Sequence, residues 1–174
     1  SIQAVSAQEE SDFFQDTSTS TIVKDLVVDY GVNMQDEGDD SQKLQQAIDE
    51  VSALGGGRII LPAGTYYLMG IKLKDNVHLE IDSEATIVAF GPKGVIFGMG
   101  LSGKGTDALV TISNVSIRGI GGSYTVDLRH GEVNEKLWFA NCRNVDNFMI
   151  ADFNILDHYT KMSGVTINLA QHED

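Results

Sequence analysis

The sequence lacks several features that define common protein classes. It contains one cysteine, Cys142, so it cannot form a disulfide within the chain. No stretch comes near the roughly 18 to 20 uninterrupted apolar residues that a membrane-spanning helix needs. Basic residues are few, with 12 Lys and Arg against 25 Asp and Glu, whereas nucleic-acid-binding proteins neutralise phosphates with Lys and Arg. These absences argue against a disulfide scaffold, a membrane span and a nucleic-acid partner.

Other absences concern catalytic chemistry. The GxSxG, HExxH and P-loop patterns do not occur, and the histidines lack the spacing of metal ligands. The sequence therefore supports neither nucleotide use nor a catalytic metal, and we expect no cofactor. Cys142 lies in an apolar, strand-like run and is expected to be a buried core residue rather than a reactive thiol. The histidines are His78, His130, His158 and His172.

The acidic residues are distributed unevenly. Residues 1–50 hold 12 acids and two bases, whereas residues 51–174 hold 13 acids and ten bases. Residues 1–21 are rich in Ser, Thr, Gln, Glu and Asp and are interpreted as a flexible N-terminal arm. No signal peptide is recognisable, although Ala4 and Ala7 could be the remains of a cleavage site. We infer that the protein is secreted, to the exterior or the periplasm.

One segment has the pattern of an amphipathic helix. Residues 40–54 carry apolar side chains at three- and four-residue spacing, and Asp39 or Asp40 can cap the N-terminus. Three glycines at residues 55–57 end the helix. An amphipathic helix of about four turns cannot bury its apolar face alone, so it must pack on the segments that follow. The apolar face comprises Leu44, Ala47, Ile48, Val51 and Leu54.

Almost all of the remaining sequence has the pattern of short β-strands. Residues 22–30 are predicted to form an entry strand, and after the helix β-type runs alternate with Pro, Gly, Asn or Asp. An imperfect repeat places an asparagine before a β-branched residue at Asn76, Asn114 and Asn144. The later runs are residues 58–61, 65–69, 77–82, 86–90, 95–97, 110–112, 115–118, 124–128, 137–140, 148–150 and 165–169.

This rhythm indicates an all-β domain of stacked coils over residues 22–174. In such a fold each coil contacts only its neighbours, and alternating side chains fill a shared interior. A β-sandwich is the structural alternative. Its antiparallel hairpins would favour Asn-Gly or Asp-Gly turns, and the sequence contains neither dipeptide.

The chain resembles the N-terminal module of pectin-lyase-like proteins. Residues 28–32, 36–41, 55–66 and 73–77, together with the helix, carry this combined pattern. The resemblance implies a right-handed parallel β-helix whose open apolar end is covered by a capping α-helix at about residues 40–54.

A closer resemblance, to the iota-carrageenase family of glycoside hydrolases, runs from about Val23 to Leu169. It is carried by residues 70–79, 114–122, 124–128 and 137–169. It implies an endo-acting, inverting hydrolase that depolymerises iota-carrageenan, a sulfated red-algal galactan.

That family uses a Glu-Thr-Asp motif on one strand of a later coil as acid and base. Two side chains that are two residues apart on a strand point to the same face and lie roughly 6.6–7 Å from each other, which leaves room for the attacking water of an inverting enzyme. This sequence contains no Glu-Thr-Asp. We therefore expect no catalytic residue in this chain, which we predict is truncated before the catalytic coils. The remaining C-terminal coils, on the same or a separate chain, would be its partner.

Two other functions remain open. One is a pectate-lyase-like or polygalacturonase-like enzyme acting on an acidic polysaccharide, and the other is a non-catalytic carbohydrate-binding β-helix.

Two groups of acids deserve individual assessment as site residues. Glu80 and Asp82 have the spacing of the catalytic pair beside His78, but they belong to the first complete coil, where solvated outward carboxylates are the favoured interpretation. A second group resembles a calcium loop only in charge, so helix capping is favoured over a structural calcium ion. This second group is Asp36, Glu37, Asp39 and Asp40.

Substrate-binding residues cannot be assigned from the sequence. Several cations could meet sulfate or carboxylate groups, because arginine pairs with planar anions through two parallel hydrogen bonds. Isolated surface charges are the favoured interpretation of these cations. They are Arg118, Arg129, His130, Lys136, Arg143 and Lys161.

Overall fold

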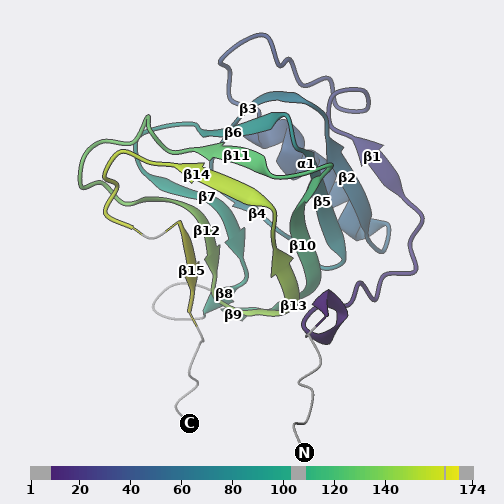
Figure 1. Ribbon diagram of the computed structural model, residues 1–174. Helices are drawn as coiled ribbons and strands as arrows, with labels where there is room; N and C mark the ends of the chain where they lie inside the picture. The colour runs from purple at the N-terminus through teal and green to yellow at the C-terminus, as the bar shows by residue number, and fades with distance from the viewer. Residues whose placement is uncertain (1–8, 103–108, 163, 169–174) are drawn as a thin grey trace, which may run out of the picture.

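The strands wind into successive coils of three (Figure 1). The structure, a computed structural model, describes residues 9–102, 109–162 and 164–168. The coils are β2 (Gly57–Leu61), β3 (Gly64–Leu68) and β4 (Ile71–Lys72); β5 (Val77–Asp82), β6 (Ala85–Ala89) and β7 (Gly94–Met99); β10 (Ile112–Ile120), β11 (Tyr124–Asp127) and β12 (Leu137–Cys142); and β13 (Val145–Ile150), β14 (Phe153–Leu156) and β15 (Val165–Ile167).

Strands at the same place in successive coils pair in parallel. Sheet A has the order β1 (Val23–Asp25), β2, β5, β10, β13; sheet B has β3, β6, β11, β14; and sheet C has β4, β7, β12, β15. One short antiparallel pair, β8 (Leu101–Ser102) with β9 (Leu109–Val110), lies outside these sheets. The prediction of stacked parallel coils is confirmed, and the sandwich alternative is excluded, because the three long sheets are parallel throughout.

The entry strand is shorter than predicted. β1 covers only Val23–Asp25, and residues 26–30 form turns. Oδ1 of Asp25 accepts hydrogen bonds from the backbone N–H groups of Val27 and Val28, both at 2.8 Å. A carboxylate that bonds its own following backbone competes with strand pairing, which explains the early end of β1.

Side chains alternate between the interior of the coils and their outer face. On β5, Val77, Leu79 and Ile81 belong to the core and are fully buried. The interior also contains packed aromatic rings, with centroids of Phe97 and Phe139 5.6 Å apart in an edge-to-face arrangement. Burial of this continuous apolar column is the main favourable term in the stability of the stack.

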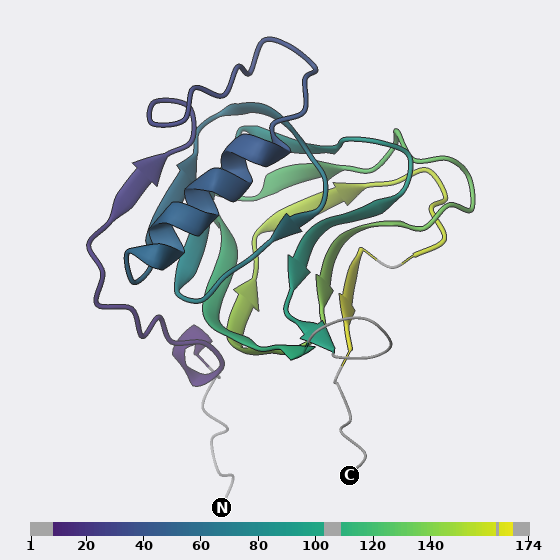
Figure 2. The same cartoon turned by 180° about the vertical axis from the view of Figure 1, so that it is seen from behind.

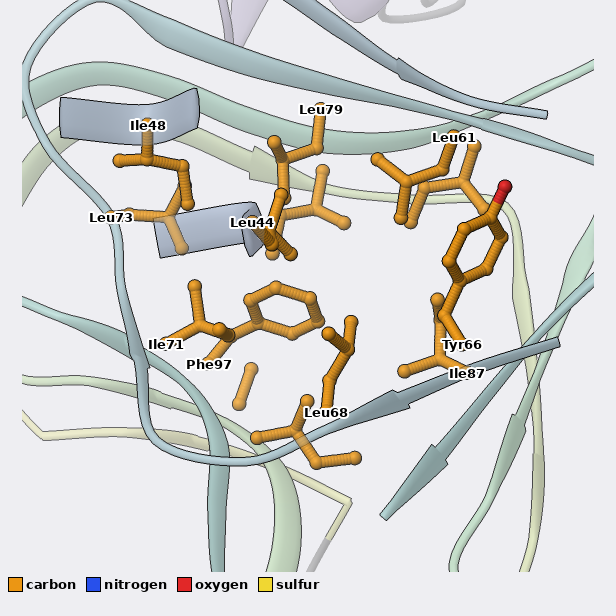
Figure 3. Close-up of a cluster of buried hydrophobic side chains, with 14 of the residues drawn as sticks. Leu44, Ile48, Leu61, Tyr66, Leu68, Ile71, Leu73, Leu79, Ile87 and Phe97 are labelled. Carbon is orange, nitrogen blue, oxygen red and sulfur yellow. The ribbon is translucent and has the colours of Figure 1, made fainter. Parts of the chain in front are cut away.

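The helix α1 (Ser41–Ala53) forms within the predicted range, preceded by the short 3-10 helix η1 (Glu10–Asp12) near the start of the described chain. Four of its five predicted apolar residues are fully buried, and α1 contacts β2, β4 and β5 (Figure 2). Figure 3 shows Leu44 and Ile48 pointing into the apolar space shared with Phe97. The fifth residue, Leu54, is 63% exposed because it follows the last helical turn.

The start of α1 differs from the prediction in one detail. Asp40 stands at the N-cap position, but its side chain makes no capping hydrogen bond. Its Oδ2 instead accepts the backbone N–H of Tyr67 at 3.1 Å, which ties the helix start to β3. Asp39 accepts the N–H of Ser41 at 2.9 Å. In the described part of the chain, neither helix has the length and apolar character required to span a bilayer.

The asparagine repeat is real, but its third member was assigned wrongly. Asn114 Nδ2 donates to Asn76 Oδ1 at 2.9 Å, and Asn147 Nδ2 donates to Asn114 Oδ1 at 3.1 Å. The strand register places Val115 opposite Phe148, so Asn147 and not Asn144 follows Asn114 in the stack. Asn76, Asn114 and Asn147 thus form an asparagine ladder. All three have positive φ, between 48° and 60°, a conformation that asparagine tolerates better than most residues.

Candidate functional site

Residues 9–21 lie along the outer face of sheet A (Figure 1). Phe14 is 8% exposed, and the backbone N–H of Thr17 donates to Asn114 Oδ1 at 3.1 Å. Gln15 exchanges two hydrogen bonds with Asn147, through its N–H at 3.3 Å and its C=O at 2.7 Å. This segment belongs to the arm predicted to be flexible. Its flexibility stays a prediction, to which the structure adds a defined set of contacts.

The arm meets sheet A at a buried polar cluster centred on His78. Nδ1 of His78 lies 2.9 Å from Ser116 Oγ, and Nε2 lies 3.1 Å from Asp16 Oδ1, a close contact that is poorly aligned for a hydrogen bond. Arg58 completes the cluster, with Nη2 2.7 Å from Asp16 Oδ2 and Nε 2.9 Å from Glu80 Oε1. Two coils and the arm thus contribute charged groups to one place.

Burial and charge act in opposite directions on the two titrating groups of this cluster. Desolvation lowers the pKa of His78 below 6.5, and the nearby Asp16 carboxylate opposes that shift only in part. For Asp16, burial raises the pKa, but the N–H of Ser18 and the charges of His78 and Arg58 lower it, and the result is a lowered pKa. A neutral His78 beside an ionised Asp16 requires the proton on Nε2, so Ser116 donates to Nδ1.

Ser116, His78 and Asp16 contain the residue types of a nucleophilic triad, but their arrangement differs from one. In a hydrolase triad the serine bonds Nε2 and the carboxylate bonds Nδ1, and here the ring is reversed. Ser116 is only 2% exposed, and the ring of Phe14 packs edge-on against His78 at a centroid distance of 6.2 Å. No substrate can reach Ser116 in this arrangement, so the chain of contacts fastens the arm.

The two acids with the spacing of a catalytic pair, Glu80 and Asp82, make structural contacts. Glu80 and Asp82 do lie on the outer face of β5, as the alternation predicted. Glu80 is bound by Arg58, and Asp82 Oδ1 accepts the N–H of Glu84 at 2.8 Å in the turn to β6. These contacts agree with the structural interpretation of both carboxylates.

The acids before α1 also serve as local acceptors. Asp36 bonds the Asn33 amide at 2.7 Å and the Gly38 N–H at 2.9 Å, in a turn that precedes Asp39 and Asp40. Burial raises the pKa of Asp40, and the hydrogen bond from the Tyr67 N–H opposes this. Within the ranges that the structure describes, no group of three or more His, Cys, Asp or Glu side chains could hold a metal ion.

Two of the candidate cations are paired with acids. Arg118 lies 3.2 Å from Glu10 of the arm, and Arg129 binds Asp127 through two hydrogen bonds, which hold the pKa of that carboxyl below its usual range. His130 lines a hollow of about 280 Å³ with Tyr67 and Phe90. Lys136 and Lys161 are exposed, and Arg143 is half-buried.

The remaining candidates are Cys142 and two histidines. Cys142 is 1% exposed, which confirms a core residue. The same burial raises the pKa of its thiol to about 11. His158 is exposed and stacks on Tyr159, and His172 lies outside the described residues.

Sequence patterns did not predict the hollow that lies between the arm and sheet A. It has a volume of about 430 Å³ and is lined by the arm and by the start of β10 and β13. The only local signal was the pair Phe13 and Phe14 in an otherwise polar segment. Its lining residues include Phe13, Gln15, Asn114, Asp146 and Asn147.

The winding of parallel strands into stacked coils, with polar ladders outside and an apolar column inside, defines a parallel β-helix protein. Comparison with known proteins then gives a narrower relationship. An iota-carrageenase of Zobellia galactanivorans is 39% identical over 147 residues, which is 83% of this chain and 29% of that protein. An iota-carrageenase of Alteromonas macleodii is 29% identical over 167 residues, 93% of this chain and 32% of that protein. The chain is a homologue of the iota-carrageenases.

Solved structures agree with this relationship. The iota-carrageenase of family GH82 from A. fortis superposes with a TM-score of 0.80 at 28% identity, covering 93% of this chain and 35% of that one. An iota-carrageenase complexed to iota-carrageenan fragments gives the same TM-score at 29% identity over the same shares. No family model matches the chain. The chain spans about a third of the length of the relatives it matches.

Proposed function

We propose that the chain is the N-terminal part of an endo-acting, inverting glycoside hydrolase that depolymerises iota-carrageenan. The observation that carries this proposal is the 39% identity to an iota-carrageenase across most of the chain. The complex of a related enzyme with iota-carrageenan fragments supports the substrate class.

In this proposal the present coils act as the scaffold and the acid and base come from further coils of the same right-handed β-helix. Two observations support it. The outward carboxylates of β5 are held by Arg58 and by the turn at Glu84, so neither is poised to activate water. The last described coil, β13 to β15, leaves its apolar side chains half-buried or exposed, and a further coil would cover them.

We also propose that α1 caps the opposite end of the β-helix. Its four apolar residues are fully buried against the first coil, and a cap removes the exposed core that a stack of coils otherwise presents. Because the proposed substrate is a polymer, the protein would act outside the cytoplasm as a secreted enzyme without a cofactor.

The proposal is tested by incubating the product of the whole gene with iota-carrageenan and measuring new reducing ends. Proton NMR of the first products gives the anomeric configuration. New reducing ends whose anomeric configuration is opposite to that of the cleaved linkage support inversion. Ends that keep the configuration of the linkage contradict it. Residues 1–174 alone are expected to release no ends. Binding to the polymer without any cleavage by the whole gene product would instead favour the non-catalytic carbohydrate-binding β-helix, and unsaturated products would favour the lyase.

A further inference from the structure

Two hydrogen-bond donors from neighbouring strands, an arginine and a histidine, converge on one carboxylate of the arm. Arg58 on β2 and His78 on β5 are partners in the parallel register. Nη2 of Arg58 lies 2.7 Å from one oxygen of Asp16, and Nε2 of His78 lies 3.1 Å from the other. Asp16 therefore occupies a place where two donors from the sheet meet.

The donors are held in position by residues of the sheet itself. Glu80 binds Nε of Arg58 at 2.9 Å and leaves Nη2 directed at Asp16. Ser116 contacts Nδ1 of His78 at 2.9 Å and leaves Nε2 directed at the same carboxylate. The His78 side chain is only 3% exposed, so its rotamer is fixed by packing. A preorganised pair of donors of this kind suits a planar or tetrahedral oxyanion.

Nε2 of His78 is the least satisfied atom of the cluster. It is buried and has no well-aligned hydrogen-bond partner among the described residues, although Asp16 is close. A buried N–H without a good acceptor costs free energy. The internal carboxylate thus fits the site imperfectly, and another oxyanion could align better with this nitrogen.

We propose that Arg58 and His78 form an anion-binding site on sheet A, which Asp16 occupies as an internal ligand and which a sulfate group occupies when the arm is displaced. The sulfate can be free sulfate or a sulfate ester of a polysaccharide. The ester rests on the proposed function, whereas the anion site does not.

The arm keeps this site closed at low anion concentration. Tethering gives Asp16 an effective concentration of roughly millimolar order, and Gln15, Thr17 and Phe14 add contacts of their own. A second pair on the same face, Arg118 with Glu10 at 3.2 Å, repeats the arrangement of an arm acid on a sheet arginine. Displacing the arm uncovers both arginines, so a polymer with repeated sulfates gains more binding free energy than a single sulfate ion does.

The test removes the internal ligand from the 174-residue chain by the substitution Asp16→Ala. Sodium sulfate and an iota-carrageenan tetrasaccharide are titrated separately, with NaCl added to hold the ionic strength constant. Binding is followed by the NMR signals of the His78 ring and by the thermal midpoint. We expect saturable binding by the variant, with a dissociation constant at least about tenfold lower than that of the wild type. We also expect the pKa of His78 to rise as sulfate binds.

Three further variants keep the result decisive. Asp16→Asn preserves the shape of the side chain and replaces Asp16→Ala if that variant does not fold. Arg58→Gln added to Asp16→Ala is expected to abolish the response. Asp127→Asn frees Arg129, a surface arginine bound to its own acid, and serves as the matched control without a histidine neighbour.

A response of Asp16→Ala no larger than that of the wild type or of Asp127→Asn would overturn the anion site. Binding of free sulfate without binding of the tetrasaccharide would support the site and overturn the ester as its ligand. Because no cleavage is measured, these outcomes are independent of whether the protein hydrolyses iota-carrageenan.

Discussion

The two ends of the described coil stack differ in how completely their apolar side chains are covered. At the α1 end, Ile59 and Leu61 of β2 are fully buried beneath the helix and the next coil. At the other end, Ile150 of β13 and Ile155 of β14 are only half-buried, although they pack on the same core. The same repeat is thus well or poorly buried according to its neighbours, because a β-coil encloses a core only when something covers each side of it.

The largest expected effect that tests this contrast is the substitution Ile48→Ala in α1. Ile48 is fully buried against the first coil, so its truncation loses transfer free energy and leaves a cavity. We expect a loss of about 2–5 kcal/mol in the free energy of unfolding, measured by guanidinium titration. A loss below about 1 kcal/mol, in the range of surface substitutions, would show that α1 is not part of the cooperative unit.

The junction between α1 and β2 sharpens the contrast with a matched pair of glycines. A Cβ on Gly56, which has a φ of +107°, would lie 2.3 Å from Asn76 Cβ, whereas one on Gly55, which has a φ of +95°, meets nothing within 4 Å. Gly56→Ala should therefore cost about 3 kcal/mol through strain and overlap together. Gly55→Ala should cost about 1 kcal/mol through backbone conformation alone.

Thermal and denaturant unfolding of both glycine variants measures the difference. Equal losses would mean that the approach of Gly56 to Asn76 relaxes at no cost.

At the other end of the stack, Ile155→Ala is expected to have a smaller effect than Ile48→Ala. Ile155 is half-buried, so roughly 1 kcal/mol is expected from the apolar area that it removes from water. The same guanidinium titration compares it with Ile48→Ala. Similar losses for the two variants would contradict the contrast between the ends.

The smallest expected effect is the pH dependence that His78 gives to the arm-covered face. Because the folded-state pKa of His78 lies below 6.5, the unfolded chain binds its proton at a higher pH than the folded chain does. The free energy of unfolding is therefore expected to fall as the pH drops from 6.5 toward the folded-state pKa. Asp16 limits the effect, because its charge raises the pKa of His78 and offsets part of the desolvation.

Urea titrations at several pH values, with His78→Gln as the control, measure this slope. The control should remove the slope near pH 6.5 while leaving the loss below pH 3.8 that follows from the lowered pKa of Asp16. An unchanged slope in His78→Gln would assign the effect to another group.

The sequence predicted those parts of the fold that depend on local periodicity. The apolar stripe of α1, apart from Leu54, and the outward position of Glu80 and Asp82 were predicted correctly, because both follow from a fixed spacing along one element. The predicted third member of the asparagine repeat was wrong because loops of varying length separate the coils. Asn144 and Asn147 are both plausible by sequence, and only the pairing of Val115 with Phe148 selects Asn147.

The candidate site was beyond local prediction for a related reason. Asp16, Arg58 and His78 are far apart in the sequence, and their contact depends on which strands become neighbours and on the path of the arm. The polar composition of the arm predicted flexibility, which stays a prediction. It carried no information about the sheet face against which the arm lies.

The ladder of asparagines has a direction. The amide nitrogens of Asn114 and Asn147 each donate to the asparagine oxygen of the preceding coil, so the bonded amides of Asn76, Asn114 and Asn147 polarise one another. At Asn147 the oxygen accepts the N–H of Gln15 from the arm, and an amide oxygen has two lone pairs. With respect to the described residues, one acceptor place on this oxygen therefore remains, and the amide of a further coil could bind there while the arm stays bound.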